Sequence, residues 1–276
     1  MTRRSFVPAL AGLAACGAVA QSAPGTGRLK QSATRGCFKG MTIEEAASAA
    51  SKLGLKGLDL ISSEHWPVLK KYGLIATMTP GGGTIADGIN KKENHAKIEQ
   101  QFRENIPNAA AAGMPNVIAL AGTRKGMPDE ESIENSVLLL NRVKALAEDK
   151  GVTICMELLN SKVDHPDYVC DHTKWGVEVC KRVNSPRMKL LYDIYHMQIM
   201  EGDIIRTIRE NIQWIGHFHT AGNPGRHEID ATQELNYKAI AKAIADLNYT
   251  GYFAHEYGPL RDPVKSMTEA IEICTV

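Results

Sequence analysis

The sequence predicts an α/β protein built as a single (β/α)8 barrel, a TIM barrel, over residues 33–276. Eight short β-branched or apolar segments alternate with longer segments of helical periodicity, which is the pattern of a barrel of parallel strands. No change in composition divides this region into two domains. A chain of 276 residues also suits a single barrel of this kind.

Each predicted strand is a run of β-branched or apolar residues bounded by turn-forming residues. Strands are expected at residues 34–38, 57–61, 74–78, 116–120, 153–157, 188–193, 214–219 and 252–256. Helices are expected where apolar residues recur about every 3.6 positions, as Ile133, Val137 and Leu140 do. Their ranges are residues 43–53, 97–112, 129–150, 173–183, 203–210, 237–247 and 263–274.

A doubly wound open sheet is the alternative fold. Such a sheet would favour a glycine-rich phosphate-binding turn after an early strand. Gly81-Gly82-Gly83 has neither the lysine of a P-loop nor the spacing of a dinucleotide-binding turn. We therefore expect these glycines to form a mobile loop after the third strand.

The first 20 residues have the features of an export signal. Arg3 and Arg4 precede an apolar run at residues 7–15, and small residues follow as far as Ala20. The paired arginines resemble a twin-arginine signal. Because the apolar run has about half of the ~20 residues that span a bilayer, we expect cleavage and export to the periplasm.

One further feature lies inside this signal and another directly follows it. Residues 13–17 resemble a lipobox, so lipidation of Cys16 and a membrane-anchored lipoprotein are the alternative to cleavage after Ala20. Residues 21–32 are rich in Gly, Ser, Ala and Thr, which predicts a flexible linker.

The charge balance argues against a nucleic-acid partner. The chain has 32 Lys and Arg residues against 31 Asp and Glu residues, a formal net charge of +1. Loss of Arg3 and Arg4 with the signal would leave a mature protein of charge about −1, without the basic excess that nucleic-acid binding requires. The near-neutral charge also disfavours an apurinic endonuclease, which would in addition need more metal ligands.

Four consecutive predicted strands end in residue types that bind metal ions: Glu157, Asp193, His219 and Glu256. In a barrel, the C-terminal ends of the strands meet at one mouth. Three carboxylates placed there would repel one another unless a cation neutralised them. With one imidazole and no thiolate, the set predicts one divalent ion, Mn²⁺, Mg²⁺, Co²⁺ or Zn²⁺, with an open position for a substrate.

Taken singly, each of these acids could instead be a helix N-cap or a surface charge. Among the neighbouring histidines, His217 would lie one layer below His219, either in the core or behind the ligands. His255 would face away from Glu256, under a helix. His196 could face solvent or the site. The others are expected in loops or at the surface: His65, His95, His165, His172 and His227.

Several segments resemble the hydroxypyruvate isomerase group of the xylose-isomerase-like barrels, which also include ketose 3-epimerases. The main ones are Tyr-Asp-Ile-Tyr-His-Met-Gln at residues 192–198, Glu-Gly-Asp at 201–203, and Ile-Gly-His-Phe-His-Thr-Ala-Gly-Asn-Pro-Gly-Arg-His-Glu at 215–228. Residues 84–90, 156–160, 234–237 and 255–259 add to the resemblance, which extends from about residue 34 to the C-terminus.

The resemblance implies that Glu157, Asp193, His219 and Glu256 bind the metal ion. It implies that Glu157 and Glu256 also transfer protons, and that His196 and Arg226 hold a small hydroxy-carbonyl substrate. The implied reaction interconverts hydroxypyruvate and tartronate semialdehyde through an enediolate. A ketose 3-epimerase and a non-catalytic, exported sugar-binding barrel are the alternatives. We also expect a homo-oligomer.

Two departures from the hydroxypyruvate isomerase pattern leave the substrate open. The third ligand position is His219, as in the sugar epimerases, where hydroxypyruvate isomerases often have Gln. Residues 228–234 also lack the expected Pro-Gly-Thr-Gly. Arg226 has a planar guanidinium that suits a substrate carboxylate, although a sugar hydroxyl could also use it.

Overall fold

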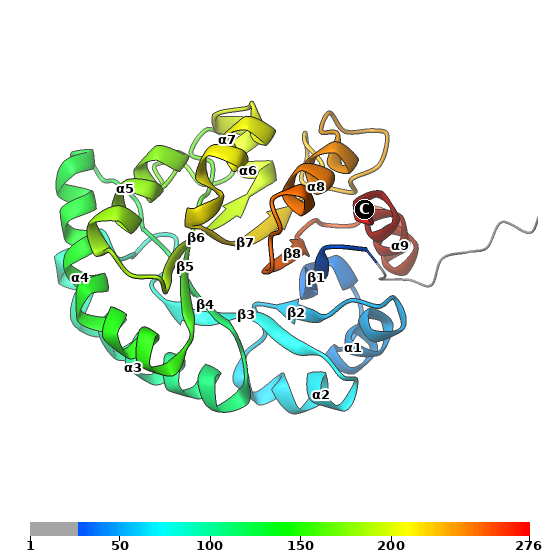
Figure 1. The fold of residues 1–276 in the computed structure, drawn as a ribbon, viewed down its shortest axis with the longest axis horizontal. Coiled ribbons are helices and arrows are strands. Elements are labelled where there is room, and N and C mark those ends of the chain that lie inside the picture. The colour runs from blue at the N-terminus through cyan, green and yellow to red at the C-terminus, as the bar shows by residue number, and fades with distance from the viewer. Residues whose placement is uncertain (1–26) are drawn as a thin grey trace, which may run out of the picture.

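A computed structural model describes residues 27–276 as a closed barrel of eight parallel strands in the order β1 to β8, surrounded by helices (Figure 1). The predicted single TIM barrel is confirmed. The export signal and the lipidation site Cys16 lie outside the described residues and stay predictions. Within residues 27–276, no helix combines the length and the apolar character needed to cross a membrane.

The strands are short and the helices are longer. The strands are β1 Lys30–Thr34, β2 Gly57–Asp59, β3 Ile75–Gly82, β4 Asn116–Ala119, β5 Thr153–Glu157, β6 Met188–Asp193, β7 Ile215–Thr220 and β8 Tyr252–His255. The helices are α1 Ile43–Lys52, α2 Trp66–Lys71, α3 His95–Ala112, α4 Asp129–Lys150, α5 Thr173–Val183, α6 Ile194–Met200, α7 Ile204–Asn211, α8 Tyr237–Asp246 and α9 Pro263–Cys274. The predicted bounds are confirmed for β5, β6, α4, α5 and α9, whereas α2 and α6 were not predicted.

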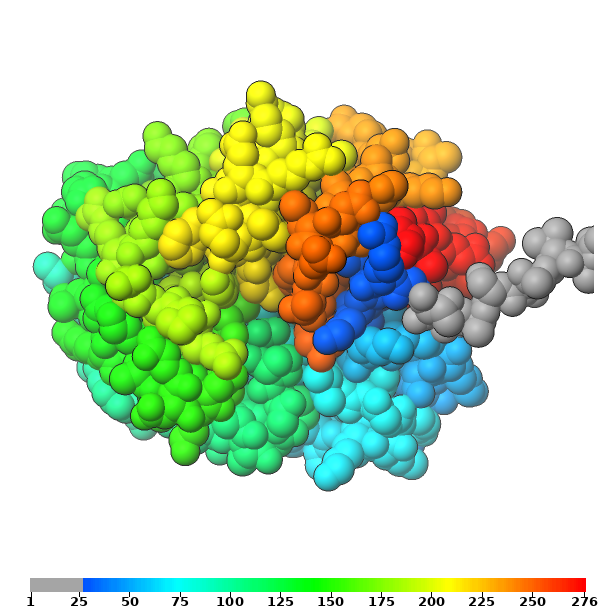
Figure 2. Space-filling model, viewed as in Figure 1, coloured from blue at the N-terminus to red at the C-terminus, as the bar shows by residue number. Residues whose placement is uncertain are grey.

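The predicted first strand at residues 34–38 was wrong. The strand is Lys30–Thr34, and residues 35–38 form a 3-10 turn. The end of the predicted linker therefore belongs to the barrel. Ser32, one of the small residues that suggested flexibility, is buried where β1 pairs with β8 and closes the barrel beside α9 (Figures 1 and 2).

Two of the three glycines at 81–83 were also misassigned, whereas Gly83 follows the strand as expected. Gly81 and Gly82 are the last residues of β3 and are not part of a loop. A Cβ atom on Gly81 would collide with the backbone carbonyl of Ile118 on β4. Glycine at this position therefore lets the two strands approach closely.

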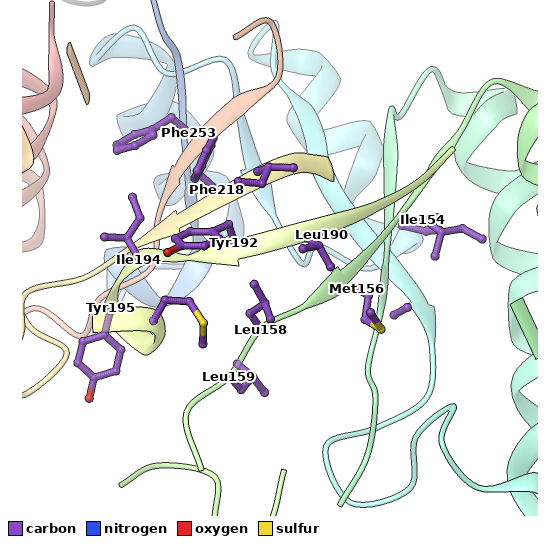
Figure 3. Packing of buried hydrophobic residues seen from close by; sticks show 14 of the residues in the cluster. Ile154, Met156, Leu158, Leu159, Leu190, Tyr192, Ile194, Tyr195, Phe218 and Phe253 are labelled. Atoms are coloured by element: carbon purple, nitrogen blue, oxygen red, sulfur yellow. The ribbon is translucent and has the colours of Figure 1, made fainter. Parts of the chain in front are cut away.

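The apolar core has two layers separated by the barrel wall. Outward-facing residues of the late strands, among them Met156, Tyr192, Phe218 and Phe253, belong to the large cluster between barrel and helices (Figure 3). A much smaller cluster fills the barrel interior: Met78, Ile118, Cys155 and Leu191. Because strand side chains alternate between faces, the next inward positions above Cys155 and Leu191 are Glu157 and Asp193.

Candidate active site

The four predicted metal ligands converge at the mouth of the barrel. Glu157 ends β5, Asp193 ends β6, His219 lies near the end of β7 and Glu256 directly follows β8. One ligand atom from each lies within 4.8 Å of those of the others. Asp193 and His219 are register partners on adjacent strands, and both are fully buried. The fold therefore brings together the residues that the strand ends indicated.

His219 is held between the ligand carboxylates and a further acid, Asp59. Its Nδ1 lies 3.3 Å from Glu157 Oε1 and 3.0 Å from Glu256 Oε2, while its Nε2 lies 3.0 Å from Asp59 Oδ2. Burial alone would lower the pKa of His219, but the charge of Glu256 and hydrogen bonds to Asp59, Glu157 and Glu256 raise it well above its usual value. The surrounding carboxylates thus strongly favour positive charge at this place.

Asp59 was not among the predicted site residues. It ends β2, fully buried, and its Oδ2 also lies 2.6 Å from His217 Nε2, while its Oδ1 accepts a hydrogen bond from the Thr77 hydroxyl. Burial raises the pKa of Asp59, but the two imidazoles outweigh this effect and keep it below the usual range. When His219 is neutral, an ionised Asp59 can accept its Nε2 proton, and the Nδ1 lone pair then faces the carboxylates.

Asp193 supplies a direct test of whether a cation fits here. Its Oδ1 accepts a hydrogen bond from the backbone N–H of His196 at 3.0 Å, but its Oδ2 is buried without a hydrogen-bond partner among the described residues. Burial and the charge of Glu256 raise the pKa of Asp193 to about 7. A buried, unsatisfied carboxylate oxygen is costly, and a cation beside it would remove the cost. The donor set therefore fits a divalent ion.

Glu256 pairs with Arg226. Arg226 Nη2 donates to Glu256 Oε2 at 2.8 Å, and the guanidinium lies 5.8 Å from the centre of the Tyr195 ring. Burial would raise the pKa of Glu256, but His219 and Arg226 together hold it well below its usual range. Arg226 therefore contacts one of the four candidate ligands and keeps Glu256 ionised.

His196 does not face solvent, so that alternative was wrong. It is fully buried on α6, which starts directly after Asp193 without a loop. Its Nδ1 lies 2.6 Å from Asn160 Nδ2, and its Nε2 has no hydrogen-bond partner among residues 27–276. Burial and the charge of Arg226 hold its pKa well below the usual value, so the ring is neutral. The neutral Nε2 lies 3.8 Å from Asp193 Oδ2, next to the candidate ligands.

The predicted positions of the other histidines were confirmed only in part. His217 is buried below His219 and contacts Asp59, and His255 faces away from the site, between Gln31 and Thr220. His95 was misjudged, whereas His165 lies in a loop as expected. His95 is buried at the start of α3, and His165 lines a cavity at the barrel mouth, with its ring centre 5.3 Å from that of His196.

Two cavities adjoin the four ligands. One has a volume of about 470 Å³, and Glu157, Glu256, Arg226 and His165 form part of its lining. The other, of about 410 Å³, lies toward β1 and also touches Arg226 and Glu256. A small molecule can therefore reach both glutamates from the barrel mouth.

A closed TIM barrel with acids and imidazoles at the C-terminal ends of its strands has the architecture of an enzyme. Residues 42–274 match the sequence profile of the family described as xylose isomerase-like TIM barrel. The chain belongs to this family.

Curated relatives include several isomerases. A 2-oxo-tetronate isomerase from Pectobacterium atrosepticum is 29% identical over 80% of this chain and 88% of its own length. The hydroxypyruvate isomerase of Escherichia coli is 30% identical over 58% of this chain and 64% of its own length. A 2-oxo-tetronate isomerase from Cupriavidus necator is 36% identical, but the match spans only 46% of either chain. The chain is an enzyme of the isomerase class.

Solved structures share the whole fold. A protein from Brucella melitensis described as an AP endonuclease of family 2 has a TM-score of 0.75 at 25% identity, covering 87% of this chain and 97% of the other. A D-psicose 3-epimerase with D-tagatose from Clostridium cellulolyticum also has a TM-score of 0.75, at 18% identity, covering 89% and 98%. At these identities the likeness supports the barrel architecture.

Proposed function

We propose that this chain is a metal-dependent isomerase that moves a proton between adjacent carbons of an α-hydroxy carbonyl compound. The observation that carries the proposal is the convergence of Glu157, Asp193, His219 and Glu256 at the barrel mouth, with one ligand atom of each within 4.8 Å of the others. The names of the curated relatives make hydroxypyruvate and tartronate semialdehyde the first candidate pair.

These four residues would hold one divalent ion, Mn²⁺, Mg²⁺, Co²⁺ or Zn²⁺. The buried, unsatisfied oxygen of Asp193 and the Nδ1 of His219, turned toward the carboxylates, fit such an ion. When bound, the ion would act as a Lewis acid on the substrate carbonyl and stabilise the negative charge of an enediolate.

The two glutamates would carry the proton. One takes a proton from the hydroxyl-bearing carbon, the C–H electron pair becomes the enediolate double bond, and a proton returns to the former carbonyl carbon. The hydroxyl proton passes to the other oxygen, so atoms and charge balance. Glu256 follows β8 and Glu157 ends the non-adjacent strand β5, so the two carboxylates would reach the substrate from different sides.

His196 and Arg226 would orient the substrate. The neutral Nε2 of His196 can accept a hydrogen bond from a substrate hydroxyl, or donate one in its other tautomer. Arg226 presents a planar guanidinium beside Glu256, where it can hold a carboxylate or a carbonyl oxygen. Both residues would align the two reacting carbons between the glutamates.

A ketose 3-epimerase is the second candidate. The same glutamates would remove and return a proton at one carbon instead of two. His219 at the third ligand position supports this candidate, because the resemblance associates His at this position with the epimerases.

Solvent deuterium exchange tests the proposal. The chain without residues 1–20 is incubated in D₂O with Mn²⁺ and one substrate per sample, either hydroxypyruvate or a ketose. The substrates are followed by NMR. We expect deuterium at a substrate carbon next to the carbonyl, loss of this exchange after chelation, and recovery when Mn²⁺ is restored. Ligand binding without any exchange would instead support a non-catalytic sugar-binding barrel.

A further inference from the structure

The 470 Å³ cavity extends well beyond the groups that would transfer the proton. Its charged lining comes from the end of β5, the residue after β8 and the loop that follows β7, whereas a second group of lining residues comes from α3 and the ends of β3 and β4: Gly81, Gly83, Gln101, Asn105, Ile118 and Leu120. We call these six residues the distal subsite. At about 30 Å³ per non-hydrogen atom, a three-carbon acid would fill roughly 200 Å³, less than half of this cavity.

We propose that Gln101 and Asn105 of α3 determine substrate specificity. Together with the other members of the distal subsite, they would bind the uncharged, hydroxylated end of a substrate longer than three carbons. This inference rests on the proposed proton transfer and concerns the part of the substrate that does not react.

The two amides are fixed by the backbone of the β3 end. Gln101 Oε1 accepts a hydrogen bond from Gly83 N–H at 3.1 Å, and Asn105 Nδ2 donates to the Gly81 carbonyl at 2.8 Å. Since the two residues are one helical turn apart, they share a face of α3. Each side chain is therefore held in a defined orientation before a ligand arrives.

The remaining atoms of these amides define the ligand chemistry. Gln101 Nε2, a donor, and Asn105 Oδ1, an acceptor, have no hydrogen-bond partner among the described residues. A neighbouring donor and acceptor suit hydroxyl groups, each of which can both donate and accept. A carboxylate or phosphate would be repelled by the acceptor and would meet no cation, because none of the six residues is charged.

The walls of the distal subsite are apolar. Ile118 and Leu120 come from the β4 end, and Leu60 and Ile85 lie at the rim with 39% and 38% of their surface exposed. Leu60 also has a φ of +59°, an uncommon conformation for a bulky residue. Aliphatic side chains pack against the C–H groups of a sugar-like chain, while the amides bind its hydroxyls.

The glycines let the end of β3 pack closely against its neighbours, so that backbone forms this part of the cavity lining. Gly81, Gly82 and Gly83 present no side chain at the end of β3, and a Cβ atom on Gly83 would lie 2.8 Å from the Leu120 carbonyl. A larger residue at Gly83 would therefore be strained. The structure thus combines exposed glycine backbone, apolar side chains and two oriented amides in one place.

Substrate length provides the first test. The metal-loaded chain without residues 1–20 is assayed for solvent deuterium incorporation with hydroxypyruvate, xylulose and fructose. We expect kcat/KM to be at least tenfold higher for a five- or six-carbon ketose than for hydroxypyruvate. Exchange with hydroxypyruvate that is equally fast or faster would overturn the distal subsite and leave the proposed function intact.

The second test changes one atom of the distal subsite. Gln101→Glu keeps an oxygen for Gly83 N–H but replaces the free donor by an acceptor. We expect KM for the better ketose to rise at least tenfold, with kcat changed less than threefold and with a much smaller change for hydroxypyruvate. The matched control is Gln100→Glu, the same change at the exposed neighbour on α3, which should leave all constants within twofold.

If no substrate exchanges deuterium, binding measurements still test the distal subsite separately from the proposed function. That outcome would contradict the proposed function. Xylulose and fructose affinities, measured by ligand-observed NMR on the wild type and on Gln101→Glu, would still test the distal subsite. An at least tenfold weaker affinity of the variant supports it, and equal affinities overturn it.

Discussion

The two halves of the barrel make different contributions to the same site. β5 to β8 supply the charged side chains Glu157, Asp193, His219 and Glu256, whereas β3 and β4 supply glycine and aliphatic residues and α3 supplies two amides. The first half of the barrel therefore shapes the cavity, and the second half contains the groups suited to the reaction. A barrel permits this division because its strand ends all open onto one mouth, regardless of which strand carries the chemistry.

We expect the largest loss of activity from a substitution in the second half of the barrel. Glu256→Gln keeps the shape of the side chain but removes the carboxylate that would accept a proton, so we expect kcat to fall on the order of 10³-fold. Turnover is measured with the better substrate at saturating Mn²⁺, so that weaker metal binding does not account for the loss.

Glu134→Gln is the matched control for this change, because Glu134 is exposed on α4. We expect its turnover to remain within twofold of the wild type. Glu157→Gln should behave like Glu256→Gln. Full turnover in either site variant would contradict the two-glutamate mechanism and, with it, the assignment of chemistry to the second half.

The predictability of the fold follows the same division. The bounds of β5 and β6 were predicted correctly because each is a short, mostly apolar run closed by one acid, a pattern that is visible locally. In the first half, small residues in β1 and glycines in β3 looked like a linker and a loop. Their role is close contact with a neighbouring strand, which depends on residues remote in the sequence.

The predictability of the site was limited for a related reason. Four strand-end residues could be recognised because their positions alone brought them together. Asp59 contacts His217 and His219 across about 160 positions of the sequence, and no local pattern separates it from any other acid. His165 likewise lies in a loop whose path only the folded chain defines.

A second prediction tests the structural role of the first half. Gly81→Ala would place a Cβ atom against the Ile118 carbonyl, and backbone cannot move aside as a side chain can. We expect the free energy of unfolding, measured by urea denaturation, to fall by about 3 kcal/mol. The control is Gly36→Ala, where the nearest atom to the new Cβ is Thr34 Oγ1 at 3.5 Å, and where we expect a change of about 0.5 kcal/mol or less. Equal losses in the two variants would show that close strand contact is not what requires Gly81.

The smallest expected effect concerns Asp59, a residue of the first half that contacts His217 and His219 of the second half. Asp59→Asn keeps a similar shape but replaces one oxygen by an amide nitrogen, which weakens the acceptor for His219 Nε2–H. Loss of a partner behind a metal-binding histidine typically weakens metal affinity. We therefore expect Mn²⁺ to bind about tenfold more weakly, a loss of ~1.4 kcal/mol in binding free energy measured by calorimetry.

The control is Thr77→Val, which removes only the hydroxyl donor to the other oxygen of Asp59 and should change Mn²⁺ affinity less than threefold. An unchanged affinity in Asp59→Asn would mean that the second half forms the metal site alone. A tenfold loss would mean that the first half, besides shaping the cavity, also sets how His219 presents its lone pair.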